Sequence, residues 1–254
     1  MSALPRASLL NLPGEIRNTI FEYALTASAH LRPTSSFYKK CIIQPALNQL
    51  QFVNRQLHAE TRDLEIRYNC LEFRSSWWPY RATPVQCAEY YFANMPEYKR
   101  CWVREVAIEG KDPFDHRWLQ SLPWLPELTT FCQTYPNIRI KYICPLWLQK
   151  EDRMERMYIA IKIGSDYSLA LRGDVLPHLF GLAEDMQRQI TFYQARLEGL
   201  GRLDNFRVYP AVDALPETWE SEECKAYWEG ISVVPEGGIE VWVRAVKGWI
   251  EHGI

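Results

Sequence analysis

The chain has 254 residues, of which 47% are hydrophobic and 24% are charged. This composition is typical of a globular protein with its own core, and it excludes a collagen, a long disordered chain and a disulfide-stabilised miniprotein. The 29 Lys and Arg residues nearly balance the 31 Asp and Glu residues, and the net charge of −2 favours neither a polyanion-binding protein nor an acidic tail protein.

The first predicted element is a helix over residues 13–26. Pro13 suits the first helical position, where its missing N–H would be unpaired in any case, and Glu15 follows in the first turn, where the helix dipole favours an acid. Leu12, Ile16 and Ile20 recur every four residues, so they form an apolar stripe along this helix.

Residues 27–44 have the polar composition of a loop, with one short strand expected over residues 40–44. A set of apolar side chains at helical spacing then predicts one long helix over residues 45–69; its members are Leu50, Val53, Leu57, Leu64 and Tyr68.

The rest of the chain alternates between strand-like and helix-like segments. We expect strands over residues 70–74, 102–108, 138–143, 157–163 and 206–209, and helices over residues 84–94, 123–135, 177–200, 216–229 and 239–252. Residues 213–254 carry nine acids against three Lys and Arg, which predicts acidic solvent faces on the final helices.

The order of these elements predicts a mixed α/β (α+β) fold. A helical unit is expected over residues 1–75, followed by a body of short strands and amphipathic helices over residues 76–254. Because no polar linker separates the two parts, we expect them to pack as one globule.

Two segments of the N-terminal part carry a distinctive pattern. Residues 9–25 read LLNLPGEIRNTIFEYAL, and residues 50–62 read LQFVNRQLHAETR. With the strand-like segment that follows, they resemble the opening of fungal F-box-like proteins, including the related fungal domain named for two Glu-x-Arg motifs. Those motifs are here Glu15-Ile16-Arg17 and Glu60-Thr61-Arg62.

The resemblance implies a protein–protein adaptor. F-box proteins bind a Skp1-type linker of a cullin ubiquitin ligase, and their remaining chain recruits the target protein to be modified. Carried over to this chain, Leu12, Pro13, Ile16 and Ile20 would contact the linker. About 20 residues separate the two helices, where an F-box has a short connection. Burial of the stripe against the protein's own C-terminal part is therefore an equal alternative.

The two Glu-x-Arg motifs predict a contact between helices. Residues two apart on a helix do not face each other, so each motif offers an acid and a base to the other helix. We expect Arg17 to pair with Glu60 and to tie the helices together. The alternative is that all four charged side chains lie in water, where such pairs contribute about 0–1 kcal/mol each.

The sequence lacks the common motifs of catalysis, metal binding and nucleotide binding. It has no Cys-x-x-Cys, His-x-x-x-His, Gly-x-Ser-x-Gly or Walker A pattern. We therefore predict no catalytic residue, no metal and no cofactor. The acids beside His116, Asp112 and Asp115, are more typical of a helix N-terminus than of a catalytic cluster.

The aromatic content is high, with 10 Trp, 14 Tyr and 10 Phe, and most of these side chains are expected in the core. Trp77 and Trp78 are adjacent and point to opposite faces of an extended chain, so one of them is a candidate partner contact. The alternative function is a small-molecule-binding protein or enzyme with a pocket in this aromatic-rich body. Basic residues do not interleave the aromatics densely, so we expect no nucleic-acid partner.

The N-terminal residues lack the apolar stretch of a secretory signal, and no apolar run reaches the ~18 residues of a membrane helix. We expect a cytoplasmic or nuclear protein without a membrane partner, whose seven cysteines are reduced.

Overall fold

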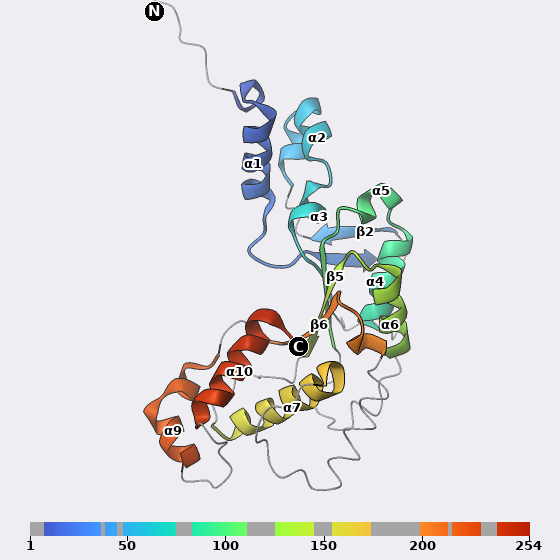
Figure 1. Ribbon diagram of the computed structural model, residues 1–254. Coiled ribbons are helices and arrows are strands. Elements are labelled where there is room, and N and C mark those ends of the chain that lie inside the picture. The colour runs from blue at the N-terminus through green and yellow to red at the C-terminus, as the bar shows by residue number, and fades with distance from the viewer. Residues whose placement is uncertain are drawn as a thin grey trace, which may run out of the picture. The chain divides into compact units, whose positions relative to one another are not determined.

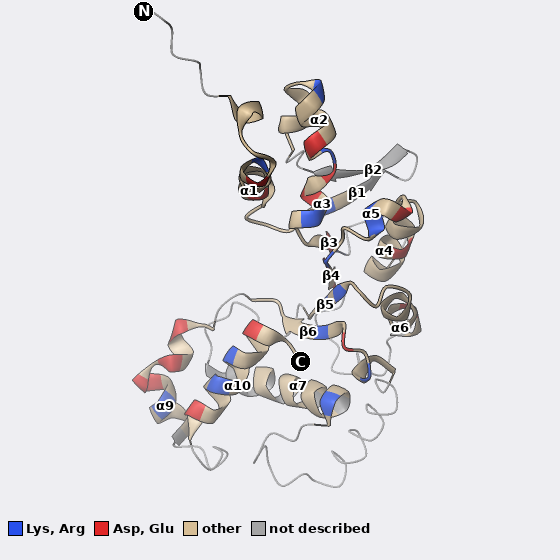
Figure 2. Ribbon diagram, turned by 45° about the horizontal axis from the view of Figure 1, so that its top comes forward, with Lys and Arg blue, Asp and Glu red and all other residues tan. Residues whose placement is uncertain are grey.

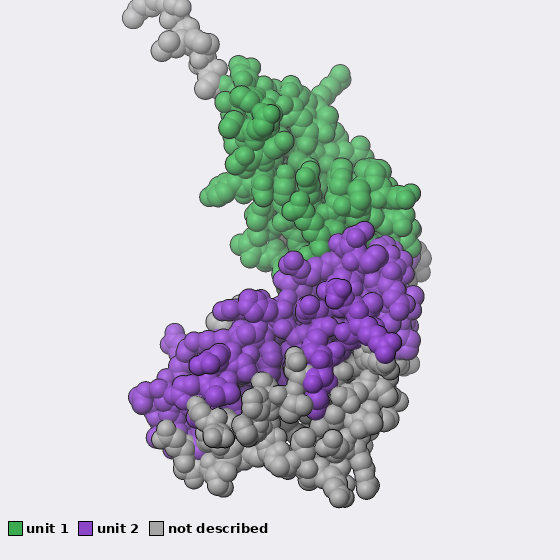
Figure 3. Space-filling model, in the orientation of Figure 1, with its two compact units in different colours: residues 1–72, 91–105 green, residues 73–90, 106–254 purple. Residues whose placement is uncertain are grey.

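The computed structural model describes residues 8–36, 39–44, 48–74, 83–110, 125–144, 154–173, 199–212, 215–229 and 238–254 (Figure 1). Helices and strands are mixed along the chain, which confirms the α+β fold. The chain forms two compact units: unit 1 contains residues 1–72 and 91–105, and unit 2 contains residues 73–90 and 106–254 (Figure 3). The expected boundary at residue 75 lies close to the first of these divisions, but unit 1 also includes residues 91–105, which the sequence assigned to the body.

The first part of unit 1 contains short helices and one β-hairpin. Its elements are η1 (Leu9–Asn11), α1 (Gly14–Leu25), β1 (Arg32–Ser36), β2 (Lys39–Gln44), η2 (Leu50–Phe52), α2 (Arg55–Thr61) and α3 (Leu64–Tyr68). Helix α1 was expected over residues 13–26, and Pro13 is its N-cap rather than its first helical residue. The short helix α5 (Glu97–Arg100) was not predicted.

The core of unit 1 joins α1 to α2. Phe21, Leu25 and Leu57 are buried together. Partly buried side chains from the flanking elements pack around them: Leu9, Leu10, Leu50, Leu64 and Tyr68. Because no single helix here is long enough to be stable alone, this shared apolar contact holds the short helices in place.

The prediction of one helix over residues 45–69 was wrong. The segment is divided into η2, α2 and α3. Asn54 adopts an extended conformation and its side chain accepts a hydrogen bond from the Leu57 N–H at 2.9 Å, so it caps a new helix. Asp63 has a left-handed conformation with φ of 66°, which ends the helical path between α2 and α3. Apolar periodicity continues across both breaks and therefore conceals them.

The hairpin of unit 1 pairs β1 and β2 antiparallel, with Arg32 opposite Gln44. The strand expected over residues 40–44 is thus confirmed, whereas the loop expected at residues 32–36 is a strand. The composition of β1, Arg-Pro-Thr-Ser-Ser, has little apolar content, so only its pairing with β2 reveals it.

The strands β3 (Leu71–Phe73), β4 (Glu105–Glu109), β5 (Arg139–Cys144) and β6 (Phe206–Pro210) form a sheet in that order. Strands β5 and β6 run parallel, with Ile140 opposite Phe206. Four expected strands are confirmed by this sheet, although β4 begins later than residue 102. Turn hydrogen bonds from Trp102 N–H to Lys99 and from Val103 N–H to Arg100 continue the end of α5 and delay the strand.

Among the later helices, α4 (Pro84–Ala93), α6 (Leu125–Thr134) and α10 (Ile239–His252) confirm the predicted helices in those regions. The helix predicted over residues 216–229 is divided into η3 (Glu217–Glu220) and α9 (Glu222–Glu229). Ser221 causes this break, because its Oγ accepts a hydrogen bond from the Cys224 N–H and caps α9.

The strand predicted over residues 157–163 was wrong, because this segment belongs to helix α7 (Met154–Arg172). Buried residues continue at helical spacing well past residue 163; they are Ala160, Ile161, Gly164, Tyr167, Ser168 and Leu171. A run of consecutive apolar residues fits a buried strand or a buried helix equally well, and only the downstream spacing distinguishes them.

Several expectations lie outside the described residues. These are the Asp112–His116 cluster, the aromatic pair Trp77 and Trp78, and most of the helix expected over residues 177–200. Residues 199–200 of that helix are described, and they are helical.

The described tryptophans of unit 2 are core residues. Trp219, Trp228, Trp242 and Trp249 are buried, and the Trp228 and Trp242 rings meet edge to face with centroids 5.6 Å apart. Outside this core, Glu217, Glu220, Glu222 and Glu223 are exposed on η3 and α9, and Figure 2 shows the acidic character of α9. The expected acidic solvent face is therefore present.

Buried thiols occur in the same unit. Cys132 of α6, Cys144 of β5 and Cys224 of α9 are buried, and all are free thiols. Burial raises the pKa of the Cys132 thiol to about 12. The Cys132 thiol is therefore protonated in the folded protein at neutral pH.

Candidate functional site

Helix α1 has one buried side and one exposed apolar side. Phe21 and Leu25 are only 1% exposed and pack in the core of unit 1. On the other side, Ile16 is 49% exposed, Ile20 is 37% exposed and Tyr23 is 89% exposed. Because residues on a helix advance by about 100° each, Ile16, Ile20 and Tyr23 share one side of α1 that points away from the core.

Leu12 and Pro13 extend this apolar surface beyond the helix. Leu12 ends η1 and is 36% exposed, and Pro13 caps α1 and is also exposed. We call Leu12, Pro13, Ile16, Ile20 and Tyr23 the α1 face.

Tyr23 is the member of the α1 face that sequence reasoning missed. It lies three residues after Ile20 and seven after Ile16, a spacing that places all three on one side of a helix. That spacing was visible in the sequence, but steps of four residues from Leu12 do not reach Tyr23. The other two expected partner contacts, Trp77 and Trp78, lie outside the described residues.

Arg17 and Glu60 form the ion pair that the two Glu-x-Arg motifs predicted. Arg17 Nε lies 3.0 Å from Glu60 Oε2, and Arg17 Nη2 lies 3.0 Å from Glu60 Oε1, so the pair is bidentate. The same guanidinium donates from Nη1 to the carbonyl oxygen of Leu12 at 2.6 Å. Arg17 therefore fixes the turn that carries Leu12 and Pro13 to helix α2.

Other residues of segment 50–62 support this pair. Gln56 Nε2 donates to Glu60 Oε1 at 2.9 Å, one helical turn away. The pKa of Glu60 is lowered by the hydrogen bond from Gln56 first and by Arg17 second. Segment 50–62 thus acts structurally: Asn54 begins α2, Gln56 orients Glu60, and Glu60 binds Arg17 of α1.

Replacing Glu60 with glutamine should make the packing of α1 on α2 less sensitive to acid. The lowered pKa means that the Glu60 carboxylate stabilises the folded state above its ordinary value of 4.5, and that this contribution is lost as pH falls through the lower folded value. Hydrogen exchange of α1 amides should be slower in the wild type than in Glu60→Gln at pH 7. This difference should disappear in acid, and a difference that grows as pH falls would contradict the assignment.

A second link ties the ends of α1 and α3 together. Asn69 is buried, and its Nδ2 donates to the carbonyl oxygens of Leu25 at 2.7 Å and Glu65 at 2.8 Å. Its Oδ1 accepts from the Ala27 N–H at 2.6 Å. One side chain thus satisfies backbone groups at the ends of two helices, which would otherwise lack intrahelical partners.

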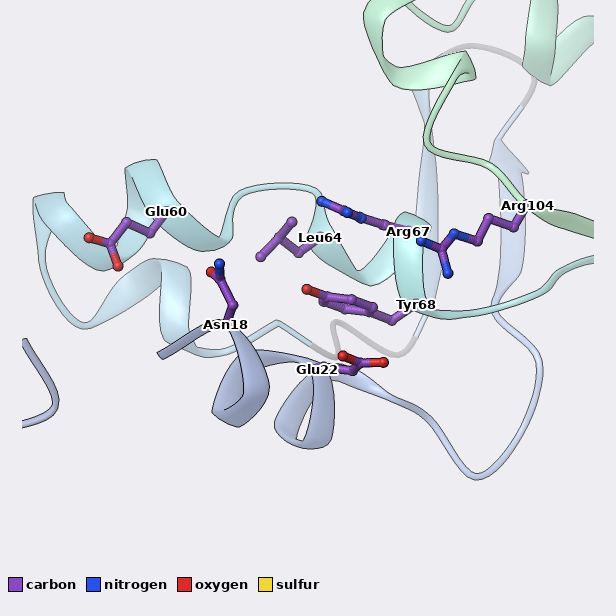
Figure 4. A pocket seen from close by; sticks show the side chains of 7 residues that line it. All are labelled: Asn18, Glu22, Glu60, Leu64, Arg67, Tyr68 and Arg104. Carbon is purple, nitrogen blue, oxygen red and sulfur yellow. The ribbon is translucent and has the colours of Figure 1, made fainter. Parts of the chain in front are cut away.

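An open pocket of about 360 Å³ lies on the other flank of α1 (Figure 4). Its lining comes from α1, α2, α3 and the segment before β4, all within unit 1: Asn18, Glu22, Glu60, Leu64, Arg67, Tyr68 and Arg104. Most of this lining is polar or charged, in contrast to the apolar α1 face. Unit 1 therefore carries two surfaces of different chemistry.

Among the described residues, no group of three or more His, Cys, Asp and Glu side chains is arranged to hold a metal ion. In the same part of the chain, none of the helices combines the length and the apolar character that crossing a bilayer requires.

Unit 1 thus carries an apolar helix face held by the Arg17–Glu60 pair and by Asn69, and a charged pocket on the other flank of α1. Comparison of the chain with models of protein families, with curated proteins and with solved structures finds no match.

Proposed function

We propose that this chain is a protein–protein adaptor that docks a Skp1-type linker protein through the α1 face, and that it acts as a substrate receptor of a cullin-type ubiquitin ligase. The observation that carries the proposal is the exposure of Ile16, Ile20 and Tyr23 on one side of α1, whose opposite side is buried, together with the exposure of Leu12 just before the helix.

Three features of the α1 face suit a docking surface. Its apolar side chains are contiguous, which is typical of surfaces that another protein covers. It lies on a helix held by the Arg17–Glu60 pair and by Asn69, so little conformational freedom is lost on binding. Four of its five residues, Leu12, Pro13, Ile16 and Ile20, are those that the resemblance to fungal F-box-like proteins implies for linker binding.

The alternative of a ligand pocket among the aromatic side chains of the C-terminal body has less support. The Trp219, Trp228 and Trp242 side chains fill the core of unit 2.

The direct test is binding of the full chain to a purified Skp1-type linker, measured by isothermal titration calorimetry. Ile16→Asp and Ile20→Asp should each weaken binding at least about tenfold, because a buried apolar contact would be replaced by a desolvated charge. Both residues are exposed, so the folded state should be retained, and circular dichroism checks this.

Asn18→Asp is the matched control, because it adds the same charge to the same helix on the side facing the pocket. It should leave linker binding within about twofold, since exposed charges on the far side of a helix are screened. Absence of binding by the wild type, or full binding by Ile16→Asp and Ile20→Asp, would refute the proposal.

A further inference from the structure

The pocket of unit 1 contains two arginines that form no ion pair within the part of the chain that the structure describes. Arg67 is on α3, and Arg104 directly precedes β4. Both side chains are exposed. Neither has a carboxylate of a described residue within 4.0 Å, unlike Arg17, Arg32 and Arg74, which are all paired. Two guanidinium groups are thus available to a ligand.

The pocket arranges these groups around a fixed aromatic side chain. Figure 4 shows the Tyr68 ring lying between the Arg67 side chain and Glu22, with its hydroxyl directed toward Asn18 and Leu64. Arg67 extends along the Tyr68 ring toward Leu64, and Arg104 lies at the end of the pocket farthest from Glu60. Tyr68 also packs against the core of unit 1, which fixes the ring and the floor of the pocket. The Tyr68 hydroxyl therefore stands on a rigid base.

The charges of the pocket favour a doubly negative ligand. Of its two carboxylates, Glu60 is bound by Arg17 and Gln56. No described residue donates a hydrogen bond to the Glu22 carboxylate. The negative charge of Glu22 partly offsets the positive charges of the two arginines. A carboxylate ligand carries one negative charge, and repulsion by Glu22 would cancel much of its attraction to the two arginines. A dianion interacts more strongly with two guanidinium groups, whose planar donors match phosphate oxygens.

We propose that this pocket binds a phosphate monoester dianion, held by Arg67 and Arg104 with the Tyr68 hydroxyl as a further donor. The pocket is open to solvent, so a phosphorylated side chain of another polypeptide and a free phosphorylated small molecule both offer the required chemistry.

This site is separate from the α1 face. Asn18 and Glu22, which line the pocket, lie roughly 120–160° around α1 from Ile16 and Ile20. A ligand in the pocket and a protein on the α1 face can therefore bind together. The proposal does not depend on the identity of the docked protein.

The test is titration of the full chain, by isothermal calorimetry at low ionic strength, with a short peptide containing one phosphoserine. The wild type should bind this peptide and should not bind the unphosphorylated one. Arg67→Ala and Arg104→Ala should each weaken binding about tenfold or more, and Glu22→Gln should tighten it severalfold by removing an opposing charge. A parallel titration with inorganic phosphate distinguishes a free phosphorylated molecule from a phosphorylated protein segment as the ligand. Equal affinity for phosphate and peptide assigns the site to a free phosphorylated molecule, and higher affinity for the peptide assigns it to a protein segment.

Arg55→Ala is the matched control, since it removes an exposed arginine of unit 1 that does not line the pocket. It should leave the affinity within about twofold. The proposal is wrong if neither the peptide nor phosphate binds, or if binding responds to Arg55→Ala as strongly as to Arg67→Ala. Ile16→Asp should leave phosphate binding unchanged, so failure of linker docking and failure of this proposal are measured separately.

Discussion

Replacing Asn69 with alanine should destabilise unit 1 by about 2–4 kcal/mol. The substitution removes three hydrogen bonds to backbone groups, with Leu25, Glu65 and Ala27. The side chain is buried, so those groups would lose their partners without full access to water. The end of α1 would separate from the end of α3, and the α1 face would lose its support.

Hydrogen exchange of α1 and α3 amides in the full chain measures this change locally, which matters because two compact units need not unfold together. Asn18→Ala is the control, because Asn18 is exposed and its side chain has no hydrogen bond within the described residues. It should change exchange rates little. Equal protection in wild type and Asn69→Ala would show that the Asn69 contacts do not stabilise unit 1.

Replacing Gly201 with alanine should destabilise unit 2 by about 3 kcal/mol. A Cβ at this position would overlap the carbonyl oxygen of Leu171, which is backbone and cannot rotate away. Arg172 follows Leu171 and donates to the Gly201 carbonyl at 2.9 Å and to the Phe206 carbonyl at 2.8 Å. Movement of either backbone would therefore also disturb the start of β6.

Gly199→Ala provides a close comparison, because this glycine lies two residues earlier in the same helical turn. Its Cβ would meet only Thr129 Cγ2 at 3.4 Å, an ordinary contact. Alanine is also the better helix former, so Gly199→Ala should be neutral or slightly stabilising. Chemical denaturation of both variants, followed by Trp fluorescence, distinguishes them. Similar midpoints would mean that the close approach at Gly201 is relieved without cost.

Periodicity predicted the helices whose apolar side is continuous and whose ends carry local signals. Helix α10 was predicted with its observed limits, because Gly238 precedes it, Gly253 follows it, and Trp242, Val246 and Trp249 recur on one side. Strands β5 and β6 were predicted for the same reason, at a period of two.

The wrong predictions occurred where tertiary contacts or single residues override the pattern. Asn54 and Asp63 interrupt an apolar series that otherwise reads as one helix. Strand β1 depends on pairing with β2, which composition does not encode.

The candidate site was predicted in part. The spacing within each Glu-x-Arg motif required a partner on another helix and so predicted the pairing of Arg17 with Glu60. The stripe at Leu12, Ile16 and Ile20 was also visible in the sequence. The pocket was not, because Arg67 and Arg104 are 37 residues apart in the chain and only the fold brings them together.

The buried cysteines give the protein internal reporters of its own opening. Only a thiolate attacks an alkylating reagent, and Cys132 is both buried and held protonated by its raised pKa. Cys101 of unit 1 is exposed and can react in the native state. A pulse of thiol reagent followed by mass spectrometry would therefore label Cys101 at once, and Cys132 only as fast as the core around α6 opens. The kinetics of that opening can be read without introducing any foreign probe.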